Sequence, residues 1–171
     1  MSAAGGNGLP LASRLFKSRL LGLTLGFVCV VFGMYPLHPS LWVWAWMLIN
    51  AFVWPHVAYQ LSRRASNSLR SERRNLLFDS FCGGFWVGAM HFNPLPSVTT
   101  LSMMTMNNVA IGGPRFMLAG WVAQGLGIGA ALLVFAPAFV AVTSEAQLYA
   151  CLPILMLYPL APVSYTHLTL P

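Results

Sequence analysis

The chain has 171 residues, of which 57% are hydrophobic and only 7% are charged. Soluble domains carry about a quarter charged residues, so this composition excludes an ordinary soluble protein and indicates an integral membrane protein. At ~20 residues for each crossing, the length allows about six membrane helices and no soluble domain of ordinary size. The net charge of +6 comes from basic residues beside apolar runs, which is typical of topology signals and argues against nucleic-acid binding.

The first predicted element is a disordered segment over residues 1–13, which begins with a run rich in Gly, Ala, Ser and Asn. Basic residues follow it, as they do in a signal peptide. The apolar run over residues 20–37 is long enough to span a membrane, and no small-residue cleavage site follows it. We therefore expect a first membrane helix that is retained.

A turn is predicted at Pro36 and Pro39, because each proline lacks a backbone donor and disfavours helix in the residue before it. The second predicted helix runs from residue 41 to about residue 61 and opens with tryptophans typical of a membrane interface. Pro55 lies within this helix, so we expect a kink near His56.

The densest group of charges in the sequence lies between the second and third predicted helices, and we interpret it as a short loop. The third helix is predicted over residues 76–93 and ends before Pro94. The fourth, over residues 97–111, carries several Thr and Asn residues, so neighbouring helices should shield it from lipid.

The fifth helix is predicted from residue 116 to about residue 141, after a turn at Gly112, Gly113 and Pro114. It contains small residues suited to close helix contacts, among them the GxxxG pair Gly125 and Gly129. The sixth helix is predicted from residue 148 to about residue 160. The three cysteines are scattered singly in apolar segments, so we expect buried hydrophobic residues and no disulfide or metal framework.

All nine Lys and Arg residues fall on one side of a six-helix topology, at the N-terminus, the second loop or the fourth loop. The positive-inside rule makes that side cytoplasmic. The predicted fold is therefore an all-α polytopic bundle of about six transmembrane helices, with both termini in the cytoplasm. The loop arginines, interpreted as a topology anchor that contacts anionic lipid, are Arg63, Arg64, Arg70, Arg73 and Arg74.

The last nine residues, 163–171, are polar where the sixth helix should finish its crossing. They resemble the translated read-through of a sequencing-library adapter. We therefore expect that the native domain covers residues 14–162 and that its natural continuation has been lost.

Four polar side chains are predicted to share one layer near the cytoplasmic face: His56, Asp79, Asn107 and Asn108. An unpaired carboxylate inside a membrane costs ~2.5 to 3.5 kcal/mol at the centre, so Asp79 needs a partner. One interpretation is a polar switch, in which His56 changes its charge near neutral pH. The other is ordinary interhelical hydrogen bonding, with Asp79 paired to Arg73 or Arg74. No catalytic or metal-binding residue is predicted.

Two stretches resemble the second type of bacterial membrane-associated sensor domain. The first is Arg-Arg-Asn-Leu-Leu-Phe-Asp over residues 73–79, together with Gly-Gly-Phe-Trp over residues 83–86. The second is Asn-Asn-Val-Ala-Ile-Gly-Gly over residues 107–113. The resemblance extends from about residue 14 to residue 162.

This resemblance implies an N-terminal membrane input module, usually followed by a cytoplasmic GGDEF domain that makes cyclic di-GMP from GTP. GTP and Mg²⁺ would belong to that output domain, because no GGDEF motif occurs in this sequence and three acidic residues cannot supply its metal ligands. The expected partners are the lipid bilayer, a second copy in a homodimer, and the missing output domain. Two alternatives stay open: a small transporter or channel, and a passive dimerising membrane anchor.

Overall fold

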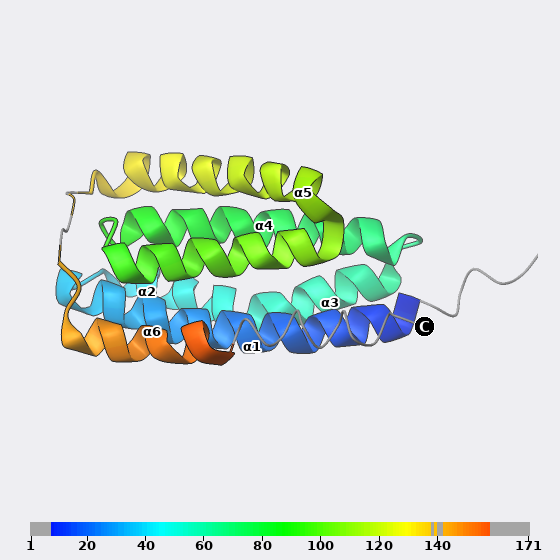
Figure 1. Cartoon of the computed structure of the whole chain (residues 1–171), viewed down its shortest axis with the longest axis horizontal. Coiled ribbons are helices and arrows are strands. Elements are labelled where there is room, and N and C mark those ends of the chain that lie inside the picture. Colours follow the sequence, from blue (N-terminus) through cyan, green and yellow to red (C-terminus); the bar gives the residue numbers. More distant parts are fainter. Residues whose placement is uncertain (1–7, 138, 140–141, 158–171) are drawn as a thin grey trace, which may run out of the picture.

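The computed structural model describes residues 8–137, 139 and 142–157, and every regular element in these ranges is a helix. Figure 1 shows the helices packed side by side along one long axis. In chain order the elements are α1 (Gly8–Met34), η1 (Tyr35–Leu37), α2 (Leu41–Leu48), η2 (Ile49–Val53), α3 (Trp54–Arg64), α4 (Ser68–Ala89), α5 (Pro94–Phe135) and α6 (Glu145–Leu157). The predicted all-helical class is confirmed.

Three helical segments in the described ranges are long and apolar enough to cross a membrane: Leu15–Leu37, Leu41–Arg64 and Pro94–Phe135. The apolar helix α6 is shorter. The six crossings stay a prediction. Helix α1 begins at Gly8, inside the segment expected to be disordered, whereas the suspected non-native tail at 163–171 lies outside the described residues.

The helix irregularity expected at Pro55 lies one turn before His56. Residues Ile49–Val53 form a π-helix between α2 and α3, and Pro55 occupies the first turn of α3. A proline cannot donate to the carbonyl four residues earlier, and its ring pushes that carbonyl away. That carbonyl belongs to Ala51, inside the π-helix, so the wider turn accommodates the proline.

The charged stretch predicted as a loop is largely helical. Only residues 65–67 connect α3 to α4, and α4 begins at Ser68, eight residues before the predicted start. The side chain of Asn67 accepts a hydrogen bond from the backbone N–H of Arg70 over 2.9 Å and so caps the new helix. Because of this early start, Glu72 lies on the same helix as Asp79.

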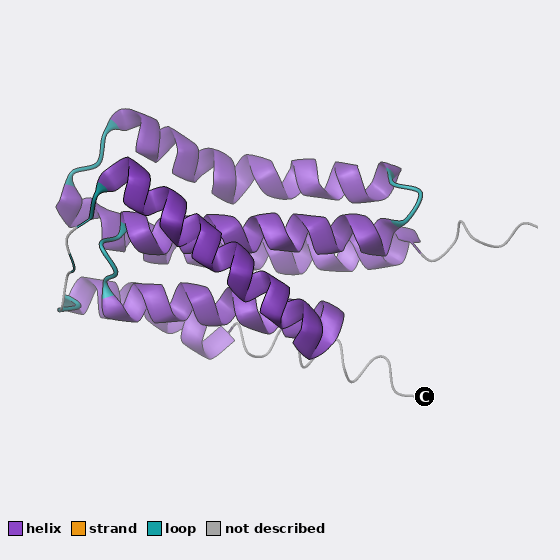
Figure 2. Cartoon of the chain, turned by 90° about the horizontal axis from the view of Figure 1, so that it is seen from above, coloured by secondary structure: helices purple, strands orange, loops and turns teal. Residues whose placement is uncertain are grey.

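Helix α5 consists of two halves that reverse direction at Gly113. The backbone there has φ 68° and ψ −167°, a conformation that is essentially restricted to glycine, and Pro114 follows. The halves correspond to the fourth and fifth predicted helices. Figures 1 and 2 show the second half lying over the rest of the bundle and crossing it at an angle.

Close packing between α4 and the second half of α5 depends on glycines. A Cβ added at Gly84 would clash with the backbone of Gln124, and one added at Gly127 would clash with the backbone of Phe81. The predicted pair Gly125 and Gly129 does not take part, because an added Cβ at either meets nothing within 4 Å. Sequence spacing alone does not show which face of a helix meets its neighbour.

A polar network fixes α6 at its first turn. Asn93 Nδ2 donates to Gln147 Oε1 over 2.9 Å, and Thr143 Oγ1 donates to Asn93 Oδ1 over 2.9 Å. Gln147 Nε2 also donates to the carbonyl of Phe32 in α1 over 3.2 Å. The start of α6 is therefore tied both to α1 and to the turn between α4 and α5.

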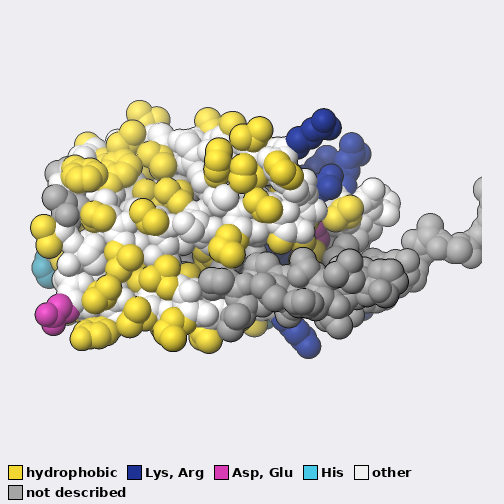
Figure 3. Space-filling model, viewed as in Figure 1, with side chains coloured by type: hydrophobic (Ala, Val, Ile, Leu, Met, Phe, Trp, Pro, Cys, Tyr) yellow, Lys and Arg dark blue, Asp and Glu magenta, His cyan; other side chains and the backbone are white. Residues whose placement is uncertain are grey.

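Lys and Arg side chains gather at one end of the molecule in Figure 3. The end of α3 and the start of α4 meet at this basic end, where Ser62 donates a hydrogen bond to Ser71 over 3.3 Å. On the face drawn in Figure 3, the described basic side chains therefore lie toward one end, as the sequence led us to expect.

We predict that Gly84→Ala will lower the free energy of unfolding by about 1 to 3 kcal/mol, because the added methyl group overpacks a helix contact made by backbone atoms. Gly125→Ala is the matched control and should change the stability very little. Thermal unfolding of the purified variants in the same detergent measures both effects. Equal stability of the two variants would contradict the predicted packing.

Candidate functional site

Three charged side chains form a buried cluster between α1 and α4. Arg19 Nε donates to Asp79 Oδ2 over 2.8 Å, and Arg19 Nη2 donates to Glu72 Oε2 over 2.8 Å. Arg19 is 5% exposed, Glu72 0% and Asp79 3%. We call these three residues the charge cluster. Guanidinium to carboxylate hydrogen bonds of this length are among the strongest in proteins.

The spacing of the two acids along α4 brings both of them to the charge cluster. Glu72 and Asp79 are seven positions apart, which is close to two helical turns, so both carboxylates lie on the face of α4 that meets α1. Trp54, the first residue of α3, donates from Nε1 to the other oxygen of Asp79 over 2.6 Å. One carboxylate therefore connects three helices.

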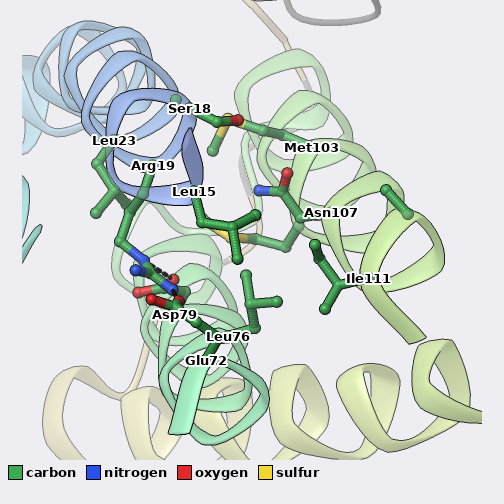
Figure 4. Close-up of a pocket in the computed structure, with 13 residues that line it drawn as sticks. Leu15, Ser18, Arg19, Leu23, Glu72, Leu76, Asp79, Met103, Asn107 and Ile111 are labelled. Carbon is green, nitrogen blue, oxygen red and sulfur yellow. Dashed lines mark hydrogen bonds and ion pairs between the residues drawn. The ribbon is translucent and has the colours of Figure 1, made fainter. Parts of the chain in front are cut away.

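A small cavity of about 30 Å³ borders the charge cluster. Figure 4 shows Asn107 and Ile111 of α5 across this cavity from Leu15 of α1, with Arg19 and its two carboxylates at one side. The space suffices for one or two water molecules and is far below the size of a typical ligand pocket.

Two atoms of the cluster have no hydrogen-bond partner among the described residues, namely Arg19 Nη1 and Glu72 Oε1. With both carboxyl groups ionised, the cluster carries two negative charges and one positive charge. Removing either partner of a buried ion pair leaves an uncompensated charge. Any movement of α1 relative to α4 must therefore rearrange this cluster.

The structure does not bring all four predicted polar residues into one network. Asp79 lies in the charge cluster, and Asn107 lines the adjoining cavity. Asn108 is fully buried and donates from Nδ2 to Ser80 Oγ over 2.8 Å, apart from the cluster. His56 is exposed on α3, with Nδ1 2.9 Å from the carbonyl oxygen of Phe52.

The partner of Asp79 is Arg19, not Arg73 or Arg74 as the sequence suggested. Sequence reasoning also missed Glu72, because it placed this residue in a loop. Two features of the sequence could have identified Arg19 and Glu72. Arg19 directly precedes the apolar run of the first helix, and Glu72 is separated from Asp79 by a spacing that puts both on one helix face.

The five arginines predicted to form a lipid-facing loop are all exposed. Arg63 and Arg64 end α3, and the other three lie in the first two turns of α4. The guanidinium of Arg73 lies over the ring of Phe116, 5.8 Å from its centre. The exposed positions leave these side chains accessible to solvent or lipid headgroups.

The fold and the charge cluster define a class of all-helical chains in which buried ion pairs join a helix that can cross a membrane, α1, to the more polar helix α4. Comparison with known families narrows this class: the model of the MASE2 domain matches residues 14–102, just over half of the chain. The chain belongs to the MASE2 domain family. The matched range includes the whole charge cluster.

Two curated relatives are similar over almost the whole chain. Both are described as a probable diguanylate cyclase, DgcC, one from Escherichia coli K12 and one from Escherichia coli O6:H1. Each is 34% identical over 154 residues, which is 90% of this chain and 42% of the relative. The chain thus spans about two fifths of the length of these relatives. No solved structure matches it significantly.

We predict that Arg19→Met will lower the free energy of unfolding by about 3 to 5 kcal/mol, because two buried carboxylates lose their cation. Lys17→Met is the matched control: Lys17 is exposed on the same helix, so its replacement should have little effect. Unfolding in detergent measures both. Neutralising the acids in an Arg19→Met, Glu72→Gln, Asp79→Asn variant should recover part of the loss, and an absence of recovery would argue against the ionic origin.

Proposed function

We propose that this chain is the membrane input module of a bacterial signalling protein that makes cyclic di-GMP. The observation that carries the proposal is the charge cluster, which lies within the MASE2 region and connects α1, α3 and α4. The similarity to DgcC supports cyclic di-GMP synthesis as the output. In this proposal the cyclase activity, with GTP and Mg²⁺, belongs to a domain beyond the part matched here.

The small number of acidic residues in this chain argues against a catalytic centre for phosphoryl transfer within it. The sequence has three acidic residues, and two of them are paired with Arg19. Divalent metals that assist phosphoryl transfer require several free oxygen ligands. The proposed role of the described helices is therefore to receive and transmit a signal.

The proposed topology has six crossings in the inner membrane, with both ends in the cytoplasm. Two observations support it. The two halves of α5, residues 94–112 and 114–135, each have the ~20 residues that a crossing needs. The Lys and Arg side chains gather at one end of the molecule, as the positive-inside rule requires (Figure 3).

The proposed switch consists of the charge cluster and the adjoining cavity. A buried ionic contact has few intermediate arrangements, since partial separation leaves unpaired charges in a medium that solvates them poorly. Such a contact favours two discrete helix arrangements, which a sensor needs. His56 has no part in this version of the switch, because it lies on the exposed side of α3. A homodimer would bring two attached output domains together.

A chimaera tests the switch. This chain replaces the matched part of E. coli DgcC, and cellular cyclic di-GMP is measured at equal expression. We predict that Asp79→Asn and Glu72→Gln will each change the cyclic di-GMP level by about fivefold or more, since coupling free energies of 1 to 3 kcal/mol correspond to ~5- to 150-fold effects. His56→Gln is the control and should leave the level unchanged. Unaltered levels in both cluster variants would refute the switch.

Two further experiments distinguish an input module from a passive anchor and from a transporter. Replacing the whole chain with an unrelated six-helix anchor should abolish regulation of the chimaera if the chain is an input module. Retained regulation would indicate a passive anchor. Ion or solute flux into liposomes that contain the purified chain would indicate a transporter or channel.

A further inference from the structure

Two cysteines from opposite ends of the sequence meet in the core. The Sγ atoms of Cys29 in α1 and Cys151 in α6 lie 2.8 Å apart, although 122 positions separate the residues. Both side chains are 0% exposed. They belong to a core cluster that also contains Leu23, Met103 and Ile154. The sequence, in which each cysteine stands alone, gave no sign of this pairing.

The contact is close enough to allow a covalent bond after a small movement. A disulfide has an S–S distance of 2.03 to 2.05 Å, so the two sulfur atoms need to approach by less than 1 Å. The third cysteine, Cys82, lies on α4 beside Trp42 and Phe85, in a different part of the structure. Cys29 and Cys151 are therefore the one thiol pair in this chain, and Cys82 is an internal control for thiol oxidation elsewhere in the protein.

We propose that Cys29 and Cys151 are a peroxide-oxidisable pair that joins α6 to α1. Hydrogen peroxide suits this site because it is small and uncharged, and both thiols are buried in a largely apolar core cluster. A bulky or charged oxidant would have to desolvate and displace the core to reach them.

The reaction proceeds in two steps. One thiol gives up its proton and its thiolate sulfur attacks peroxide; the O–O bond breaks, a sulfenic acid forms, and the departing hydroxide takes up that proton as water. The second thiol then attacks the sulfenic sulfur, the S–O bond breaks and a second water leaves. Two thiols and one hydrogen peroxide give one disulfide and two waters. The two sulfur atoms together lose two electrons.

The bond would restrain the helix that leads to the end of the described chain. Helix α6 packs against α1 and α5, while its outer face is exposed at Leu148, Tyr149 and Met156. Its first turn is already held through Gln147. A disulfide at Cys151, one turn further on, would fix the middle of the helix as well.

Mass tagging of the full chain in bacterial membranes tests this pair. Membranes are treated with hydrogen peroxide, dissolved in SDS, and labelled with a maleimide-linked polymer that adds a visible mass to each free thiol. Untreated chain should take three tags, and oxidised chain should take one, on Cys82. Subsequent reduction with dithiothreitol should restore all three tags.

Two variants separate the pair from general thiol oxidation. Cys82→Ser should take two tags before treatment and none after it. Cys29→Ser should keep its two tags after the same treatment, because Cys151 has lost its partner. Three tags on the treated parent chain would overturn the proposal, as would loss of tags from Cys29→Ser as readily as from the parent.

Discussion

The burial of Arg19 between two carboxylates is the interaction on which the arrangement of α1, α3 and α4 depends. Each hydrogen bond joins α1 to α4, and Trp54 joins α3 to the same carboxylate. Such contacts are strongly directional, and in a medium of low dielectric they exclude arrangements that leave a charge unpaired. Apolar packing alone would permit α1 to rotate or slide against α4 at much lower cost.

The contact between α4 and α5 is stabilised by close backbone packing, not by ion pairs. Gly84 and Gly127 allow the two backbones to approach until side chains no longer separate them. In lipid there is no hydrophobic force to drive helices together, so close van der Waals contact has to provide much of the stability. The reversal at Gly113 then places the first half of α5 beside α1, which brings Asn107 to the cavity next to the charge cluster.

Much of this architecture could be predicted from composition and pattern. Long apolar runs, turn prolines and the Gly113 turn predicted the helical class and the division of α5 into two halves. Two of the details that failed, the partner of Asp79 and the role of the pair Gly125 and Gly129, depend on which faces of two helices meet. The charges near Arg73 looked like a loop because a polar run carries no helical periodicity against an apolar background, although Asn67 offered a capping signal. The partner of Asp79 lies 60 residues away on another helix, and spacing along one helix cannot identify it.

In the proposed input module, the contacts of α6 suit it to carry a signal away from the charge cluster. Its first turn is fixed by Gln147 to α1 and to the turn after α4, so movement is most restricted there. Ten residues of helix, about 15 Å at ~1.5 Å per residue, separate Gln147 from Leu157. Helix α6 rests on α1, and α1 is held to α4 by the charge cluster. If α1 shifts when the cluster rearranges, the start of α6 follows it through the hydrogen bond from Gln147 to Phe32, and the rest of α6 can tilt about that contact. A disulfide at Cys151 would shorten the free part of the helix and reduce that movement.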